Sequence, residues 1–130
     1  MIPVGVSFGT GFAAQMGKRF SSNGVVLITP YTSVFDVAAN NPIFGNLRWF
    51  MWNNISAIDG VAALKDTCVV ALHGTSDQVI PYTHSKTLQA SYQGNKHYEL
   101  VTVVNEDHNS AFWRALPEFN AAMKSCSLVD

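Results

Sequence analysis

Residues 2–28 read IPVGVSFGTGFAAQMGKRFSSNGVVLI. Ile2 to Val6 is a short apolar run, and the glycine-rich turn after it leads into residues 12–20, whose alanines suit a helix packed closely on a sheet. A turn cluster at residues 21–24 then precedes Val25 to Ile28, an apolar run without the alternation of a half-exposed strand. The segment therefore predicts a strand, a helix and a second, buried parallel strand.

The same alternation continues along the chain. Cys68 to Leu72 is a third buried run, Tyr82 to Tyr92 suits a helix, and Tyr98 to Val104 suits a fourth strand. A final helix is expected over Ser110 to Lys124, interrupted near Pro117. Strands that alternate with helices predict the α/β class, with a mostly parallel sheet of about four strands and flanking helices.

Residues 30–65 break this pattern and are interpreted as an excursion over the sheet. The stretch has a polar break at residues 40–42 and a group of four aromatic side chains, Phe44, Trp49, Phe50 and Trp52. Such a group can line a pocket for an acyl chain, but aromatic side chains more often serve core or cap packing. Both interpretations stay open.

Length and charge limit the function classes. With 130 residues, the chain forms one domain at most, taken here as residues 1–130. The net charge of −1 leaves no basic field for a phosphate backbone, so nucleic-acid binding is not expected. Charged residues make up only 13% and apolar residues 48%, which excludes disorder and leaves little polar surface to cover the molecule.

The sequence also suggests a location. No basic residue precedes Lys18, so no secretory signal is expected, and the apolar runs are far shorter than the roughly 20 residues of a membrane span. Cys68 and Cys126 are too few for a disulfide scaffold and lack metal-ligand spacing. We therefore expect two reduced cysteines in an intracellular, cytoplasmic protein.

Gly5 to Gly9 spell the first chemical signal, a G-x-S-x-G motif at a strand-to-helix turn. In a nucleophile elbow of this kind, the serine backbone is strained. Small residues are needed on both sides, at the two glycine positions of the motif, so that the hydroxyl of Ser7 stands above the sheet. A glycine-rich turn that only helps the helix to pack would have the same letters. The motif alone leaves both interpretations open.

The two partners that a nucleophilic serine needs are present in suitable loops. Asp77 follows the third expected strand and His108 follows the fourth. Because ligand sites form at the carboxyl ends of parallel strands, these side chains are expected near one edge of the sheet. The histidine would take the proton of the serine and the carboxylate would orient the histidine.

Three segments of the chain resemble the α/β-hydrolases: residues 5–11, 72–85 and 107–109. The order serine, aspartate, histidine is also that of this family. Residues 30–33, together with the His-Gly-x-x-Asp motif, are similar to the serine-peptidase-like and depalmitoylase-like branch. The resemblance extends from Gly5 to about Met123.

This resemblance implies Ser7 as nucleophile, His108 as general base, Asp77 as the acid that orients it, and the backbone N–H of Phe8 as an oxyanion donor. The implied activity is that of a serine hydrolase that cleaves an ester, thioester or amide through an acyl-enzyme. The substrate would be a small molecule, an acyl compound or a peptide. No cofactor is implied.

The chain departs from the family in length, because members are about twice as long and only their carboxyl-terminal half is matched. In the family, the strand that ends at the nucleophile lies centrally, beside a strand whose loop supplies the second oxyanion donor. Neither is found here, so Ile2 to Val6 is expected to form an open edge, available for self-association or for a missing amino-terminal half. The alternative function is therefore a catalytically incomplete fragment or one partner of a split hydrolase.

The remaining histidines are expected to have structural places. His73 would pack under the loop of the acid, while His84 and His97 would lie on the surface.

Other acidic residues compete for a role. Asp36 follows the second strand, where some hydrolases place the acid, but Asp77 has the better motif. Asp107 would point away from the ring of His108. With Glu106, it stands where relatives have small residues, and the two carboxylates are expected to favour the charged form of His108.

Overall fold

The computed structural model describes residues 1–34, 36–37 and 56–128. Four strands form a parallel sheet, as the sequence predicts, and their order in it is β1-β2-β3-β4. The strands are β1 (Val4–Val6), β2 (Gly24–Ile28), β3 (Cys68–Gly74) and β4 (Tyr98–Val103). The helices are α1 (Gly9–Arg19), α3 (Ala57–Ala62), α4 (Thr83–Ser91), α5 (Ala111–Arg114) and α6 (Leu116–Ser125).

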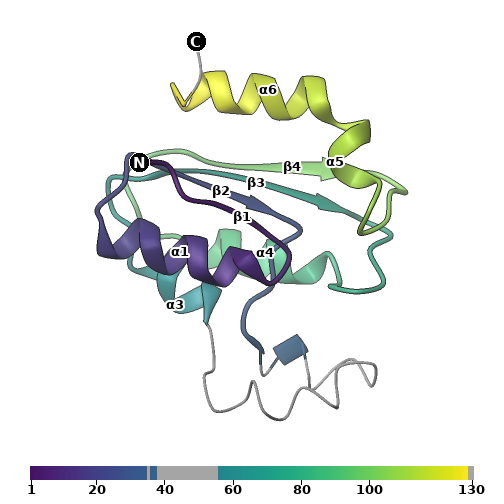
Figure 1. The fold of residues 1–130 in the computed structure, drawn as a ribbon, viewed down its shortest axis with the longest axis horizontal. Helices are drawn as coiled ribbons and strands as arrows, with labels where there is room; N and C mark the ends of the chain where they lie inside the picture. The colour runs from purple at the N-terminus through teal and green to yellow at the C-terminus, as the bar shows by residue number, and fades with distance from the viewer. Residues whose placement is uncertain (35, 38–55, 129–130) are drawn as a thin grey trace.

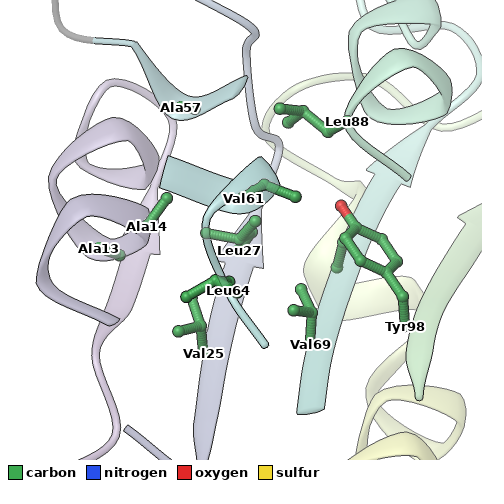
Figure 2. Packing of buried hydrophobic residues seen from close by; sticks show 11 residues of the cluster. Ala13, Ala14, Val25, Leu27, Ala57, Val61, Leu64, Val69, Leu88 and Tyr98 are labelled. Atoms are coloured by element: carbon green, nitrogen blue, oxygen red, sulfur yellow. The ribbon is translucent and has the colours of Figure 1, made fainter. Parts of the chain in front are cut away.

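The two faces of the sheet carry different helices. Helices α1, α3 and α4 cover one face, and α5 and α6 lie over the other (Figure 1). Val25 and Leu27 of β2 belong to the core of the first face, shown in Figure 2, whereas Val26 and Ile28 belong to the core of the second. Both faces of the strand are buried, which explains its uninterrupted apolar run.

Helix α3 lies in the stretch that the sequence analysis treated as irregular. Ser56 caps it by accepting a hydrogen bond from the backbone N–H of Asp59 at 3.1 Å. The helix packs against α1 at Gly60, where an added Cβ would lie 2.9 Å from the Cβ of Ala14. A serine three residues before an aspartate is a capping signal that could have predicted this helix start. The aromatic group at residues 44–52 lies outside the described residues.

The break predicted near Pro117 is present. Helix α5 ends at Arg114, and Pro117 stands in the first turn of α6, where its missing N–H costs no helical hydrogen bond.

Strand β1 forms one edge of the sheet, as expected. The N–H of Val26 bonds to the carbonyl of Pro3 at 3.0 Å, and the N–H of Ser7 bonds to that of Ile28 at 2.8 Å. In a parallel ladder, the intervening Val4 and Val6 then direct their backbone groups away from β2. These two residues are 60% and 58% exposed, and no described strand pairs with this edge.

The expectation of two reduced cysteines is wrong. Cys68 at the start of β3 and Cys126 at the end of α6 form a disulfide, with their Cα atoms 5.8 Å apart. Cys68 shares the strand face of Val70 and Leu72, which α6 covers, and this juxtaposition cannot be inferred from a separation of 58 residues. Because disulfides persist in oxidising compartments, the cytoplasmic expectation loses the support that it took from the cysteines. No described helix is long and apolar enough to cross a membrane.

Candidate active site

Ser7 occupies the sharp turn between β1 and α1. Its φ of 54° lies in the left-handed region, which is uncommon for a residue with a side chain and typical of the serine in a nucleophile elbow. Thr10 holds the turn by donating its hydroxyl and its N–H to the carbonyl of Ser7, at 2.6 and 3.1 Å. The strained conformation expected from the motif is therefore present.

The two glycines of the motif differ in what they do. A Cβ on Gly5 would lie 2.4 Å from the carbonyl oxygen of Gly9, so only glycine lets the strand approach the start of α1 this closely. A Cβ on Gly9 would meet no atom of the described residues within 4 Å. The expectation that both neighbours must be small is therefore right for Gly5 and wrong for Gly9.

Phe8 follows Ser7 at the amino end of α1, where backbone amides carry partial positive charge. Its carbonyl accepts a hydrogen bond from the hydroxyl of the buried Tyr31 at 3.0 Å, and the two rings pack with centroids 5.6 Å apart. Burial raises the pKa of Tyr31 to about 12, so its hydroxyl remains a donor at neutral pH. No sequence motif marks this support for the elbow.

Asp77 lies in the loop after β3 and is buried. One carboxylate oxygen, Oδ1, accepts from the backbone N–H groups of Val79 and Ile80 at 2.9 and 2.8 Å. The other, Oδ2, accepts from Nδ1 of His108 at 2.8 Å. Burial alone would raise the pKa of Asp77, but the hydrogen bonds from His108, His73 and Ile80 outweigh it and hold this pKa well below its ordinary value.

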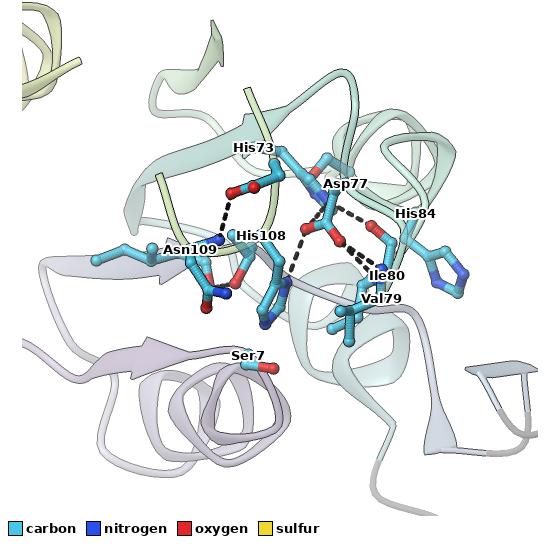
Figure 3. Close-up of polar contacts among 12 residues, drawn as sticks. Ser7, His73, Asp77, Val79, Ile80, His84, His108 and Asn109 are labelled. Carbon is cyan, nitrogen blue, oxygen red and sulfur yellow. Dashed lines mark hydrogen bonds and ion pairs between the residues drawn. The ribbon is translucent and has the colours of Figure 1, made fainter. Parts of the chain in front are cut away.

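The ring of His108 lies between Asp77 and Ser7 (Figure 3). Because an ionised carboxylate only accepts, the bond to Asp77 places the proton of a neutral ring on Nδ1 and leaves Nε2 able to take one. Within the described part of the chain, the hydroxyl of Ser7 has no hydrogen bond to His108. Catalytic hydrogen bonds are often long until a substrate is bound.

The loops that carry Asp77 and His108 are joined directly. The N–H of Ser76 bonds to the carbonyl of Glu106 at 3.0 Å, and the N–H of Asn105 bonds to the hydroxyl of Thr75 at 2.8 Å. A Cβ on Gly74 would lie 2.2 Å from the carbonyl oxygen of Glu106. Glycine in the His-Gly-x-x-Asp motif therefore lets the two loops meet, a packing role that the motif alone does not reveal.

The carboxylates of Glu106 and Asp107, which precede His108 in the chain, accept hydrogen bonds from other residues. Asp107 accepts from the N–H groups of Asn109 and Ser110 at 2.9 and 2.8 Å, so it points away from the ring as expected. Glu106 accepts from the hydroxyl of Ser110 at 2.6 Å. Neither carboxylate contacts the His108 ring among the described residues, and their effect on its charge stays a prediction.

Two of the three other histidines lie where they were expected. His73 is buried beneath the loop of Asp77, and His97 is exposed beside Glu99. The surface expectation for His84 is wrong, because it is buried and its Nδ1 accepts from the N–H of Thr32 at 3.1 Å. Burial lowers its pKa, which fits a neutral ring that accepts this bond.

Asp36 lies apart from the candidate site. Its carboxylate accepts from the hydroxyl of Thr32 at 2.5 Å, in the region of His84. Only Asp77 has a described contact with His108, which favours Asp77 as the acid.

A cavity of about 370 Å³ adjoins His108. Its lining residues are Ser76, Gln78, Val79, Asp107, His108 and Asn109. Among the described residues, no three metal-binding side chains gather in a cluster that could hold an ion.

No protein-family model and no curated protein sequence matches the chain. Solved structures match it, with low sequence identity. An alpha/beta hydrolase enzyme from a Medee basin deep-sea metagenome library has a TM-score of 0.69 and 15% identity, covering 99% of this chain and 66% of that one. The chain has part of the α/β-hydrolase fold.

Other α/β-hydrolase structures give the same result. The esterase domain of a Rhodothermus marinus protein has a TM-score of 0.69 and 13% identity, over 97% of this chain and 60% of that one. The acylaminoacyl peptidase of Pyrococcus horikoshii has a TM-score of 0.65 and 14% identity, over 98% of this chain and 22% of that one. The chain thus spans only part of each α/β-hydrolase that it resembles.

Proposed function

We propose that the chain is the carboxyl-terminal half of a serine hydrolase domain, from the nucleophile elbow onward, with Ser7, His108 and Asp77 as its catalytic triad. The observation that carries this proposal is the 2.8 Å bond from Nδ1 of His108 to the buried carboxylate of Asp77, with the ring turned toward a serine in a strained elbow. An imidazole held in this tautomer is prepared to act as a base.

The reaction would proceed in two halves. The hydroxyl oxygen of Ser7 attacks the substrate carbonyl carbon while Nε2 of His108 takes the hydroxyl proton. The tetrahedral oxyanion faces the N–H of Phe8, and its collapse expels the leaving group, which receives the proton from His108. Water, activated by His108, then attacks the acyl ester, adds its hydroxyl to the acyl carbon and releases Ser7.

The bond cleaved is an ester, thioester or amide. Two of the matched structures with this fold are named as an esterase domain and an acylaminoacyl peptidase. For this chain, we propose a small-molecule, acyl or peptide substrate, with no cofactor in the reaction.

A second candidate function is that of a catalytically incomplete partner. It is favoured by the open edge of β1, since no described strand stands where a neighbouring loop would supply a second oxyanion donor. Loss of one such donor typically lowers turnover by about 10² to 10³. A partner polypeptide that pairs with β1 would then complete the site.

An activated aryl ester tests both candidates. The proposed function predicts a burst of about one equivalent of phenol per chain, followed by steady turnover, both absent from Ser7→Ala. A burst without steady turnover would favour the incomplete partner. Equal rates for Ser7→Ala and the unaltered chain would contradict a serine hydrolase that is active as this chain alone. Parallel assays of an aryl thioester and an anilide would rank the three bond types.

A further inference from the structure

The carboxylate of Asp77 has a second histidine neighbour that the proposed reaction does not use. Nε2 of His73 lies 3.2 Å from Oδ2 of Asp77, on the same oxygen that accepts from His108. The side chains of His73 and Asp77 are both fully buried. Figure 3 shows His73 and His108 reaching the carboxylate from different elements, β3 and the loop after β4.

The neighbours of His73 determine where its proton lies. Nε2 is 2.7 Å from the carbonyl oxygen of Ile80, which can only accept, so Nε2 carries a proton. Nδ1 is 2.6 Å from the hydroxyl of Ser85, which can donate to it. A neutral ring protonated on Nε2 therefore satisfies every contact, with its single N–H directed at Ile80 and Asp77.

We propose that His73 is a positioning residue that holds the carboxylate of Asp77 in the orientation that His108 needs. This inference rests on the proposed function. The N–H of His73 joins Oδ2 of Asp77 to the carbonyl of Ile80, whose own N–H binds Oδ1 of Asp77 at 2.8 Å. Asp77 and Ile80 of this loop are thus linked both directly and through the ring of His73. The hydroxyl of Ser85 in α4 fixes that ring by its contact with Nδ1.

The charge on Asp77 makes this arrangement effective. A buried carboxylate must have its oxygens satisfied, and here four donors serve two oxygens, two N–H groups on Oδ1 and two histidines on Oδ2. Removal of His73 would leave Oδ2 with one donor and free the side chain to rotate. The tautomer and direction of His108 would then be less well defined.

Two substitutions separate the effect of the His73 N–H on Asp77 from the effect of the ring on core packing. His73→Phe keeps a planar ring and removes both nitrogens, whereas His73→Gln keeps an amide donor near the place of Nε2. His84→Phe is the matched control, because His84 is also buried and hydrogen-bonded but does not contact Asp77. Ser85→Ala, which removes only the bond to Nδ1, serves as a milder variant if His73→Phe does not fold.

The rate at which a fluorophosphonate labels Ser7 is the first measurement. His73→Phe should label about 10- to 100-fold more slowly, since a small misplacement of catalytic groups has an effect of this size. His73→Gln should recover most of the rate, Ser85→Ala should fall between them, and His84→Phe should stay near the unaltered rate. Equal losses in His73→Phe and His84→Phe would overturn the proposal, as would equal rates in Ser85→Ala and the unaltered chain if His73→Phe does not fold.

A proton resonance gives a second measurement that needs no activity. The Nδ1–H of His108 should be protected from exchange with water in the unaltered chain and in His73→Gln, and lost in His73→Phe. An unchanged resonance in His73→Phe would overturn the positioning role. If the resonance follows this pattern while no variant is labelled, the positioning role stands and the proposed function fails.

Discussion

At the scale of single residues, the elbow depends on one glycine more than on the other. An alanine methyl at Gly5 would collide with the backbone of Gly9, whereas one at Gly9, in the first turn of α1, would meet none of the described residues. Gly5→Ala should lower the free energy of unfolding by about 1–3 kcal/mol through overpacking. Gly9→Ala should change it by less than about 1 kcal/mol, in the stabilising direction, because alanine favours helices. Urea unfolding of both variants checks this, and equal losses would contradict the difference.

Asp77 gives the second prediction at this scale. Asp77→Asn should slow fluorophosphonate labelling strongly, by up to about 10⁴-fold, because an amide favours the wrong imidazole tautomer. Asp36→Asn, which changes a carboxylate with no described contact to His108, should have little effect. A larger loss in Asp36→Asn would show that the acid is wrongly assigned.

The lowered pKa of Asp77 also gives a dependence on pH. A carboxyl with a lower pKa in the folded state contributes stability above its unfolded pKa, and this contribution is lost as pH falls toward the folded pKa. The stability lost between pH 6 and pH 3 should therefore be larger for the unaltered chain than for Asp77→Asn. Urea unfolding at these two pH values measures it, and identical losses would mean that Asp77 is not held as described.

At the scale of elements, sequence patterns predicted the strands because β2 and β3 are buried apolar runs, and because β1 and β4 are short stretches with several apolar residues. Motif residues after β1, β3 and β4 could likewise be identified, since parallel strands bring these loops to one edge. Contacts between elements could not be predicted in this way. His84 is buried only because α4 packs beside the segment with Thr32, and the cysteines pair only because α6 crosses the sheet above β3.

The disulfide, which ties the end of α6 to β3, should stabilise the folded chain. Closing a loop with a separation of 58 residues typically contributes about 2–4 kcal/mol by restricting the unfolded chain. Cys126→Ser should lower the free energy of unfolding by this amount, and a reducing agent should have the same effect on the unaltered chain but none on the variant. Equal stability of both proteins with and without the reducing agent would contradict the pairing.

At the scale of the whole molecule, the apolar surface gathers along β1 and α1. Val4 and Val6 are more than half exposed. Phe12 and Met16 of α1 and Phe20, which follows the helix, are also exposed, at helical spacing. The Ile2 to Val6 edge combines this surface with backbone groups that pair with no described strand, a combination that favours pairing with another chain.

We therefore predict that the chain alone self-associates through this edge. Val4→Lys should shift it toward monomer in size-exclusion chromatography with light scattering, because a charge on an edge strand opposes pairing. Val104→Lys is the matched control, since Val104 is 68% exposed beyond the opposite edge strand β4. A 14.2 kDa monomer that persists at all concentrations without substitution would contradict the prediction.

The most direct test of the proposed triad is to locate the covalent product of a fluorophosphonate by peptide mass spectrometry. We expect the phosphonyl group on Ser7, and we expect little product when His108→Gln removes the base. A label on another serine, or one that reaches Ser7 as quickly in His108→Gln as in the unaltered chain, would contradict the assignment of Ser7 as an activated nucleophile.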